Sequence, residues 1–104
     1  MVAEPRTPCR TPAKDRDGVT NIPTWKFDLL RGHILDIVGA AGPDGFPMAE
    51  LSAAIAPRLT DDETARLGKL GWHMMAVKLE MEVAGDLARM PKVTPQRLVL
   101  PASA

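Results

Sequence analysis

Few residues in this sequence have side chains suited to covalent or metal chemistry, and they are widely spaced. The two histidines, His33 and His73, fall in different predicted helices, and neither has a cysteine or a carboxylate cluster at ligand spacing. A zinc site needs three or four such ligands around one ion. Cys9, the single cysteine, lies in a proline-rich stretch without the neighbouring base or helix N-terminus that would activate a thiolate. We therefore expect no metal site and no thiol chemistry.

The other candidates for catalysis also lack their usual sequence context. Ser52 and Ser103 are the only serines, and neither stands in a nucleophile motif. The glycines of residues 39–45 end a predicted helix, whereas a phosphate-binding loop follows a strand. The acidic run 61–63 suits the first turn of a helix, where it favours the helix dipole. No set of residues meets the requirements of a catalytic site, so the sequence predicts a non-enzymatic protein without a cofactor.

Basic residues gather toward the C-terminus, where residues 87–104 contain three of them and no acidic residue. Two more, at the start of a predicted helix, would extend this patch, and Arg58 could lie close. The candidate DNA-binding residues are Lys69, His73, Arg89, Lys92 and Arg97. Three or four phosphate contacts would give weak, salt-sensitive binding to double-stranded DNA. Alternatively, the basic segment is solvated and keeps an edge strand from pairing with other chains.

The third long predicted helix, residues 71–84, is apolar on two sides. At about 100° per residue, Met74, Val77 and Met81 share a face that should pack on the preceding helices. The opposite side carries a second apolar set, Trp72, Met75, Ala76, Leu79 and Val83. Such a helix is covered on both sides, so the second set is either ordinary core or covered by another molecule. Because twofold symmetry is the commonest solution, the latter predicts a homodimer contacted through Trp72, Met75, Leu79 and Val83.

Two further helices precede this one. Apolar residues at helical spacing predict a first helix over about residues 25–41, with Thr24 as its N-cap and Gly42-Pro43 as its stop. Phe46 precedes a proline and is expected in a short extended piece. A second helix follows from Pro47 to about Pro57. Residues 60–63 fit a capping box that begins a short helix.

The two ends of the chain differ from this helical middle. Residues 1–23 hold four prolines, mixed charges and almost no large apolar side chains, so we expect a flexible N-terminal tail. After Gly85, a natural left-handed C-cap, the runs 87–90 and 96–100 resemble strands joined by the loop 91–95, which predicts a hairpin. The resulting order is helix, short strand, two helices and a hairpin.

Residues 71–89, GWHMMAVKLEMEVAGDLAR, resemble the third helix and first wing strand of winged-helix proteins. The Gly-Trp start and the Val-Lys-Leu-x-x-Glu core are similar to a small, uncharacterised bacterial winged-helix family, over about residues 25–100. The resemblance implies an α+β, mostly helical winged helix-turn-helix fold, with three main helices and a C-terminal hairpin wing. It implies DNA-linked regulation by fold analogy alone, with a protein-interaction or dimerisation module as the alternative.

Two features depart from a DNA-reading winged helix. About fourteen residues separate the second and third helices, where a compact helix-turn-helix has three or four. The outer side of the third helix is mostly apolar, and the nearby Glu80 and Glu82 would repel phosphate.

Length and composition set the remaining expectations. A chain of 104 residues suits one domain, which we place at residues 24–101, with 102–104 as a C-terminal tail. The formal net charge is zero, which weighs against a dedicated nucleic-acid binder, although local charge matters more than the sum. A single cysteine, the lack of an apolar leader and the lack of an apolar run of about 20 residues predict a cytoplasmic protein without a membrane contact.

Overall fold

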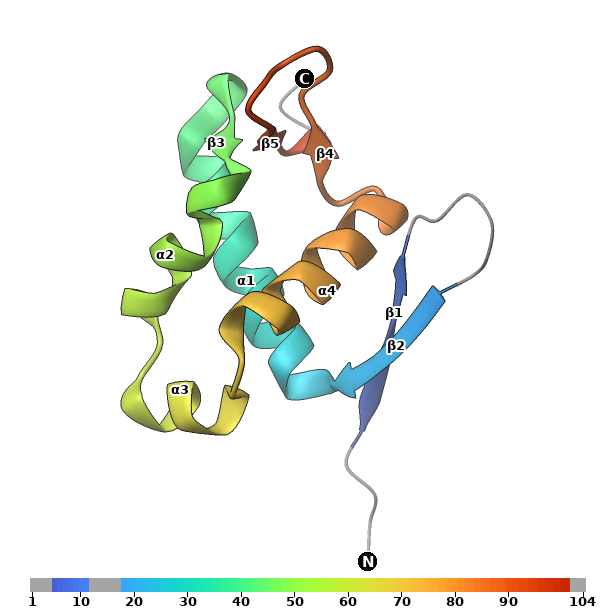
Figure 1. Cartoon of the computed structure of the whole chain (residues 1–104), viewed down its shortest axis with the longest axis vertical. Helices are drawn as coiled ribbons and strands as arrows, with labels where there is room; N and C mark the ends of the chain where they lie inside the picture. The colour runs from blue at the N-terminus through green and yellow to red at the C-terminus, as the bar shows by residue number, and fades with distance from the viewer. Residues whose placement is uncertain (1–4, 12–17, 102–104) are drawn as a thin grey trace, which may run out of the picture.

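The computed structural model describes residues 5–11 and 18–101 (Figure 1). An N-terminal hairpin is followed by four α-helices and a small second sheet. The strands and α-helices are β1 (Arg6–Thr11), β2 (Gly18–Pro23), α1 (Thr24–Ala41), β3 (Phe46–Pro47), α2 (Leu51–Ile55), α3 (Asp61–Leu67), α4 (Leu70–Ala84), β4 (Ala88–Arg89) and β5 (Arg97–Val99). This confirms an α+β, mostly helical architecture. None of the helices in the described part of the chain is long and apolar enough to cross a membrane.

Helix α1 forms the centre of the core. Its residues Leu30, Ile34 and Val38 recur every four positions and are almost fully buried, as the apolar spacing predicts. The helix ends at Gly42, whose φ of 68° is a conformation that suits glycine. Its start differs from the expectation, because Thr24 is the first helical residue and not the N-cap. The Thr24 hydroxyl instead lies 2.9 Å from the Thr7 hydroxyl of β1.

The connection between α1 and α4 is broken into short pieces. The predicted single helix from Pro47 to Pro57 consists of a 3₁₀ turn over Met48–Glu50, helix α2, and a second 3₁₀ turn over Ala56–Arg58. Helix α3 begins with the capping box that the sequence indicates. The Thr60 hydroxyl accepts from the Glu63 N–H at 3.0 Å, and the Glu63 carboxylate accepts from the Thr60 N–H at 2.9 Å.

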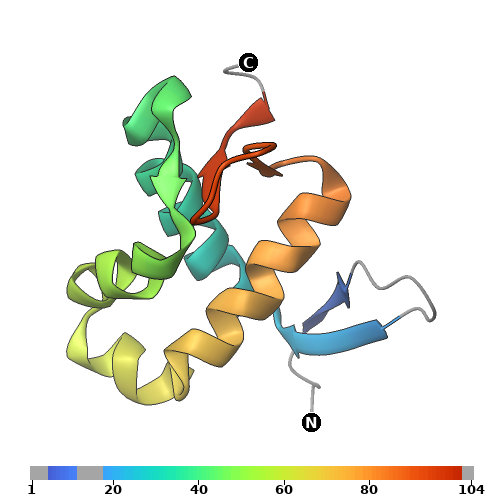
Figure 2. The same cartoon turned by 45° about the horizontal axis from the view of Figure 1, so that its top comes forward.

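Helix α4 packs across α1, and the two cross in both views (Figures 1 and 2). Val77 and Met81 are completely buried and Met74 is nearly so, which confirms the predicted inner face. The helix ends at Gly85 in the left-handed conformation, also as expected. The chain then forms β4 and β5, which pair antiparallel. Strand β3 adds to the other side of β5, giving a three-stranded sheet with the order β3-β5-β4.

The described residues of the N-terminal segment are not a flexible tail, and that expectation is wrong for them. Strands β1 and β2 form an antiparallel hairpin, and Cys9 and Ile22 on it are each only 2% exposed. Figure 2 shows the hairpin beside α4, on the opposite side of that helix from α2 and α3. Residues 1–4 and 12–17 of the predicted tail, and the predicted C-terminal tail 102–104, lie outside the described residues.

The prolines that suggested disorder fit the hairpin. In the hairpin, Pro8 lies opposite Asn21 and Pro23 lies opposite Arg6. A pair at a non-hydrogen-bonded position of the ladder exchanges no backbone hydrogen bonds, so a proline there loses nothing by lacking an N–H. The Thr24 N–H donates to the Pro5 carbonyl at 2.9 Å, so Pro5–Thr24 is a hydrogen-bonded pair. Because such pairs alternate along the ladder, Arg6–Pro23 and Pro8–Asn21 are non-hydrogen-bonded pairs. Both prolines therefore sit where a strand tolerates them.

Candidate interaction surface

Helix α4 is covered on two of its sides and open on the third. The core covers Met74, Val77 and Met81, and the hairpin packs on the side that carries Glu80. The open side carries Trp72 and Val83, which are 53% and 38% exposed, with half-buried Met75 and Leu79 between them. We call these four residues, Trp72, Met75, Leu79 and Val83, the α4 stripe. The structure thus places all four predicted interface residues together on one surface.

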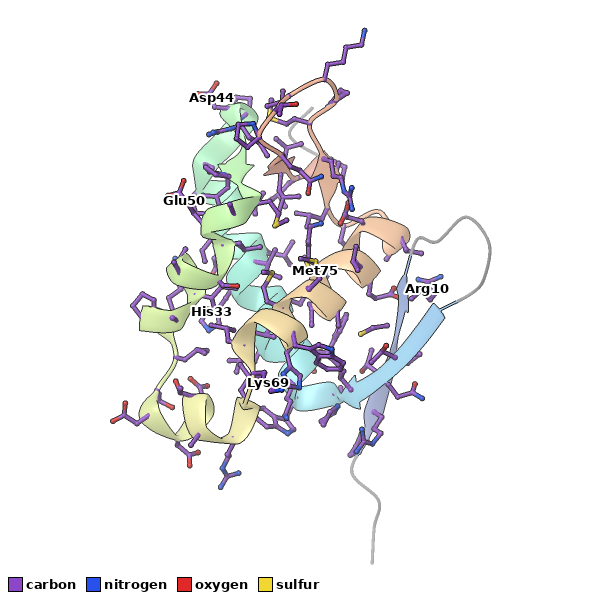
Figure 3. All side chains as sticks on the ribbon, viewed as in Figure 1. Arg10, His33, Asp44, Glu50, Lys69 and Met75 are labelled. Carbon is purple, nitrogen blue, oxygen red and sulfur yellow. The ribbon has the colours of Figure 1, made fainter. Side chains whose placement is uncertain are left out.

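A shallow hollow adjoins the stripe. It is lined by Thr20 of β2 and by four residues of α4, Trp72, Met75, Ala76 and Leu79. Its volume of about 160 Å³ is below the 300 Å³ or more of typical small-molecule sites. The hollow is open to solvent and mostly apolar, so it suits an inserted aliphatic side chain better than a metabolite. Figure 3 shows Met75, one of these lining residues, on α4.

An ion pair fastens the hairpin to α4 beside the stripe. The Glu80 carboxylate accepts from the Arg10 backbone N–H at 2.9 Å and from the Arg10 guanidinium at 2.8 and 2.6 Å. The Glu80 side chain is 9% exposed and the Arg10 side chain 53%. Hydrogen bonding from Arg10 holds the pKa of Glu80 below its usual value, although partial burial acts in the opposite direction. Glu80 is therefore a structural anchor, and its charge is not available to repel phosphate.

Two of the predicted DNA-binding residues are engaged within the molecule. Arg97 donates from Nε to the Asp44 carbonyl at 2.9 Å and from Nη2 to the Gly45 carbonyl at 3.0 Å, so it closes the turn before β3. Arg89 pairs with Glu82 of α4. Glu82 also forms an ion pair with Lys78, whose side chain is only 1% exposed and whose Nζ lies 2.8 Å from Glu82 Oε2. The angles of this contact are not those of a hydrogen bond. Both arginines are thus held against the protein.

The other three predicted DNA-binding residues are separated, because two lie at the start of α4 and one lies in a loop beyond its end. Lys92 is exposed in the loop between β4 and β5, whereas Lys69 immediately precedes α4 and its carbonyl lies 2.8 Å from His73 Nδ1. A 15-residue helix is about 22 Å long. In Figure 3, Lys69 lies at the opposite end of the helical body from Asp44, which Arg97 contacts. The structure therefore does not join the five basic residues into one patch, and Arg58 pairs with Asp36 elsewhere.

Cys9 and the histidines do not form a reactive site. Burial raises the pKa of the Cys9 thiol to about 11, and the Glu80 carboxylate adds to the rise. His33 lies on α1, whereas His73 lies in the first turn of α4. Among the described residues, no three His, Cys, Asp or Glu side chains are grouped so that they could hold a metal ion.

Reading the sequence missed the contribution of the hairpin to this surface. Thr20 lines the hollow and Arg10 anchors Glu80, but both fall in the stretch assigned to a tail. The available signal was the alternation of Thr7, Cys9 and, on the second strand, Thr20 and Ile22. The Arg10–Glu80 contact spans 70 residues and has no local sequence signal.

Comparison with known proteins identifies a family but no activity. Residues 6–98 match a family of unknown function, DUF6958, and because the match covers most of the chain, the protein belongs to that family. It includes the N-terminal hairpin, so the hairpin is part of the family's shared domain. No curated protein and no solved structure matches the chain.

Proposed function

We propose that this member of a family of unknown function is a non-enzymatic binding module of winged-helix architecture, which self-associates through the α4 stripe. One observation carries the proposal. Of the three sides of α4, only the one with Trp72, Met75, Leu79 and Val83 lacks a cover within the described chain, and it is apolar along its length. A contiguous exposed apolar patch marks an interaction site on a soluble protein.

The order of elements supports the winged-helix part of the proposal. A long helix, a short strand, a helical connection, a second long helix and a terminal hairpin follow one another, and the short strand β3 joins the hairpin as the third strand of its sheet. Under this proposal, α4 corresponds to the helix that reads DNA in winged-helix proteins. The N-terminal hairpin covers one side of that helix, which leaves less of it accessible to a DNA groove.

The spacing of the stripe supports a second copy as the partner. Met75 and Leu79 lie two residues on either side of Val77, and Trp72 and Val83 lie five and six residues from it. A twofold axis that crosses α4 near Val77 would pair two such helices antiparallel. Met75 would then contact the partner's Leu79, and Trp72 the partner's Val83. A twofold interface requires a self-complementary surface of this kind.

Charge placement favours the same arrangement. The α4 stripe contains no charged residue, and the neighbouring charges of Glu80 and Glu82 are compensated by Arg10, Lys78 and Arg89 within the same molecule. Two copies can therefore approach through this face without burying an unpaired charge, which would cost several kcal/mol. Tryptophan, which the stripe exposes at Trp72, is enriched among the residues that contribute most to binding at the centre of an interface.

Light scattering coupled to size-exclusion chromatography tests self-association. We expect the wild type to have the mass of a dimer at high protein concentration and Leu79→Glu to be a folded monomer, because the carboxylate would be buried without a partner. Ala53→Glu adds the same charge at an exposed position of α2, outside the stripe, and should leave the dimer intact. A wild-type monomer at the highest attainable concentration would contradict the proposal.

Double-stranded DNA is the second candidate partner, and one observation favours it. The segment from Leu87 to Pro101 contains no acidic residue, and Lys92 is exposed in its loop. Since Arg89 and Arg97 are held by internal contacts, we expect few phosphate contacts. The DNA-binding constant should fall by about one power of the salt concentration for each phosphate contact. This function would place the protein in the cytoplasm, in line with its single free cysteine.

Fluorescence anisotropy with a random duplex at low and moderate salt tests this second candidate. Lys92→Ala should weaken any binding without affecting the fold, because the side chain is exposed in a loop. The same substitution should leave the mass measured by light scattering unchanged. Absence of binding at low salt would retire the DNA proposal and leave self-association untouched.

A further inference from the structure

The two faces of the N-terminal hairpin have different roles. Thr7, Cys9 and their cross-strand partners Ile22 and Thr20 point toward the helices, and Cys9 and Ile22 are buried there. Arg6, Pro8, Arg10 and Asn21 alternate with them and are exposed. The hairpin therefore lies face-on against the protein, and its two long edges are the remaining places where backbone groups can seek partners.

The hydrogen-bonding register shows which backbone groups point outward. The Thr24 N–H bonds to the Pro5 carbonyl, so the alternate pairs Thr7–Ile22 and Cys9–Thr20 are the hydrogen-bonded pairs of the ladder. The pairs between them direct their N–H and carbonyl groups away from the partner strand. Arg10 confirms this register independently, since its N–H points away from β2 and donates to Glu80.

The two edges of the hairpin differ in their cover. On β1, the outward N–H of Arg10 is bonded to α4, and Pro8 has no N–H to offer. On β2, the same alternation directs the N–H and carbonyl of exposed Asn21 away from β1. The Asn21 carbonyl receives only a long contact of 3.4 Å from the Arg6 guanidinium. Within residues 5–11 and 18–101, strand β2 is therefore the open edge.

Strand β2 also lacks the features that protect an edge strand. Its sequence, GVTNIP, contains no charged residue, and its proline stands at the last position. Natural sheets usually protect exposed edges with lysine, internal proline, bulges or a covering element. An unprotected six-residue edge is expected either to be covered in the functional state or to aggregate.

The open edge borders the α4 stripe. Thr20 of β2 lines the same hollow as Trp72, Met75 and Leu79. A further strand would lie about 4.8 Å beyond β2, on the side where the stripe is exposed. Side chains on its inner face would then cover the hollow. The two-stranded hairpin thus leaves the α4 stripe uncovered, and one more strand beside β2 would cover it.

We propose that β2 of a second copy supplies this strand, so that two hairpins form a continuous four-stranded antiparallel sheet across the dimer. This inference rests on the proposed self-association and names its second contact. A twofold axis perpendicular to the sheet between the two β2 strands keeps both α4 helices on the same face of the sheet. It brings the two stripes toward each other in antiparallel orientation, as the spacing around Val77 also requires. The sheet contact and the stripe contact require the same antiparallel orientation of the two α4 helices, so the proposal assigns both contacts to one twofold axis.

The decisive variant removes one outward N–H and leaves the hairpin ladder intact. Asn21→Pro loses the N–H that points away from β1, and proline is tolerated at such an edge position. Because symmetry repeats the loss in each copy, we expect the dimer Kd to rise by roughly tenfold to a hundredfold. Asn21→Ala keeps the N–H and removes only the exposed side chain, so its Kd should match that of the wild type. Sedimentation velocity over a concentration series gives the three constants.

Hydrogen exchange on the wild type makes the test independent of whether Asn21→Pro folds. The amide of Asn21 should be protected at high protein concentration and should exchange faster on dilution, in parallel with dimer dissociation. If the wild type dimerises and Leu79→Glu does not, but Asn21 exchanges equally fast at both concentrations, the sheet proposal is wrong and the proposed function stands. If the wild type is a monomer throughout, both are wrong.

Discussion

Replacing Ile22 with Ala tests whether the hairpin is an integral part of the domain. Ile22 is 2% exposed and contacts the same buried cluster as Leu30 and Val77. Truncating a buried isoleucine to alanine removes its transfer free energy and leaves a cavity, at a cost of about 2–5 kcal/mol. We expect the lower half of that range, because the hairpin lies at the edge of the core and can relax.

Such a loss is a large part of the 5–15 kcal/mol that stabilises a typical domain. For a domain of this size it lowers the melting temperature by roughly 8 °C or more. Urea denaturation followed by circular dichroism measures the change in free energy of unfolding. Asn21→Ala is the matched control, because Asn21 is exposed on the same strand, and should alter stability by less than about 0.5 kcal/mol. An equally small effect of Ile22→Ala would show that the hairpin does not pack on the core and would favour the flexible tail that the sequence predicts.

Three other variants and conditions probe the structure at separate points. The lowered pKa of Glu80 contributes stability that is present above its ordinary value of 4.5 and is lost as the pH falls through the lower pKa of the folded state. The urea midpoint of Glu80→Gln should therefore fall less than that of the wild type between pH 6 and acid pH. Parallel curves for the two proteins would contradict the role given to Arg10. Cys9, buried and with its pKa raised to about 11, should react with an aromatic disulfide reagent far more slowly at mild alkaline pH in the folded protein than in urea; equal rates would show that the hairpin opens freely. Gly45→Ala should lower the melting temperature, because φ is +77° there and a Cβ would lie 2.6 Å from the Met90 sulfur and 3.0 Å from the Leu98 carbonyl; an unchanged melting temperature would argue against the close packing of β5 on this turn.

The helical part of the fold follows from local signals in the sequence. The period of Leu30, Ile34 and Val38 predicts α1, and Thr60 with Glu63 predicts the start of α3. Gly85 predicts the end of α4. Each of these signals lies within one helix, where residues three and four apart are neighbours. The boundaries of α1 and α4 shift by one residue and the inner face of α4 is as expected, whereas the predicted helix from Pro47 to Pro57 is divided into α2 and two 3₁₀ turns.

The hairpin could not be predicted in the same way, because its stability comes from distant residues. Few large apolar side chains stand on β1, and a proline, Pro8, interrupts the sequence of that strand. What fixes it is the burial of Cys9 and Ile22 against the helices and the contact of Arg10 with Glu80. Neither is visible from composition or local periodicity, and a stretch of such low hydrophobicity predicts disorder.

The candidate surfaces also divide into one that local sequence signals predict and one that depends on contacts between distant residues. The α4 stripe follows from helical spacing alone, and the structure groups its four residues as expected. The basic patch required residues from both ends of α4 to meet, although nothing local relates Lys69 to Lys92. No local pattern predicts the internal partners that the structure gives to Arg97 and Arg89.

Cysteine cross-linking tests the antiparallel α4 contact most directly. Met75→Cys and Leu79→Cys are prepared separately, each with Cys9→Ala, and mixed in equal amounts under mild oxidation. A twofold axis near Val77 predicts a covalent dimer in which Cys at position 75 of one chain joins Cys at position 79 of the other. Ala53→Cys on exposed α2, with Cys9→Ala, measures random collision. Cross-linking well above that control would support the account, and a yield no greater than the control would contradict it.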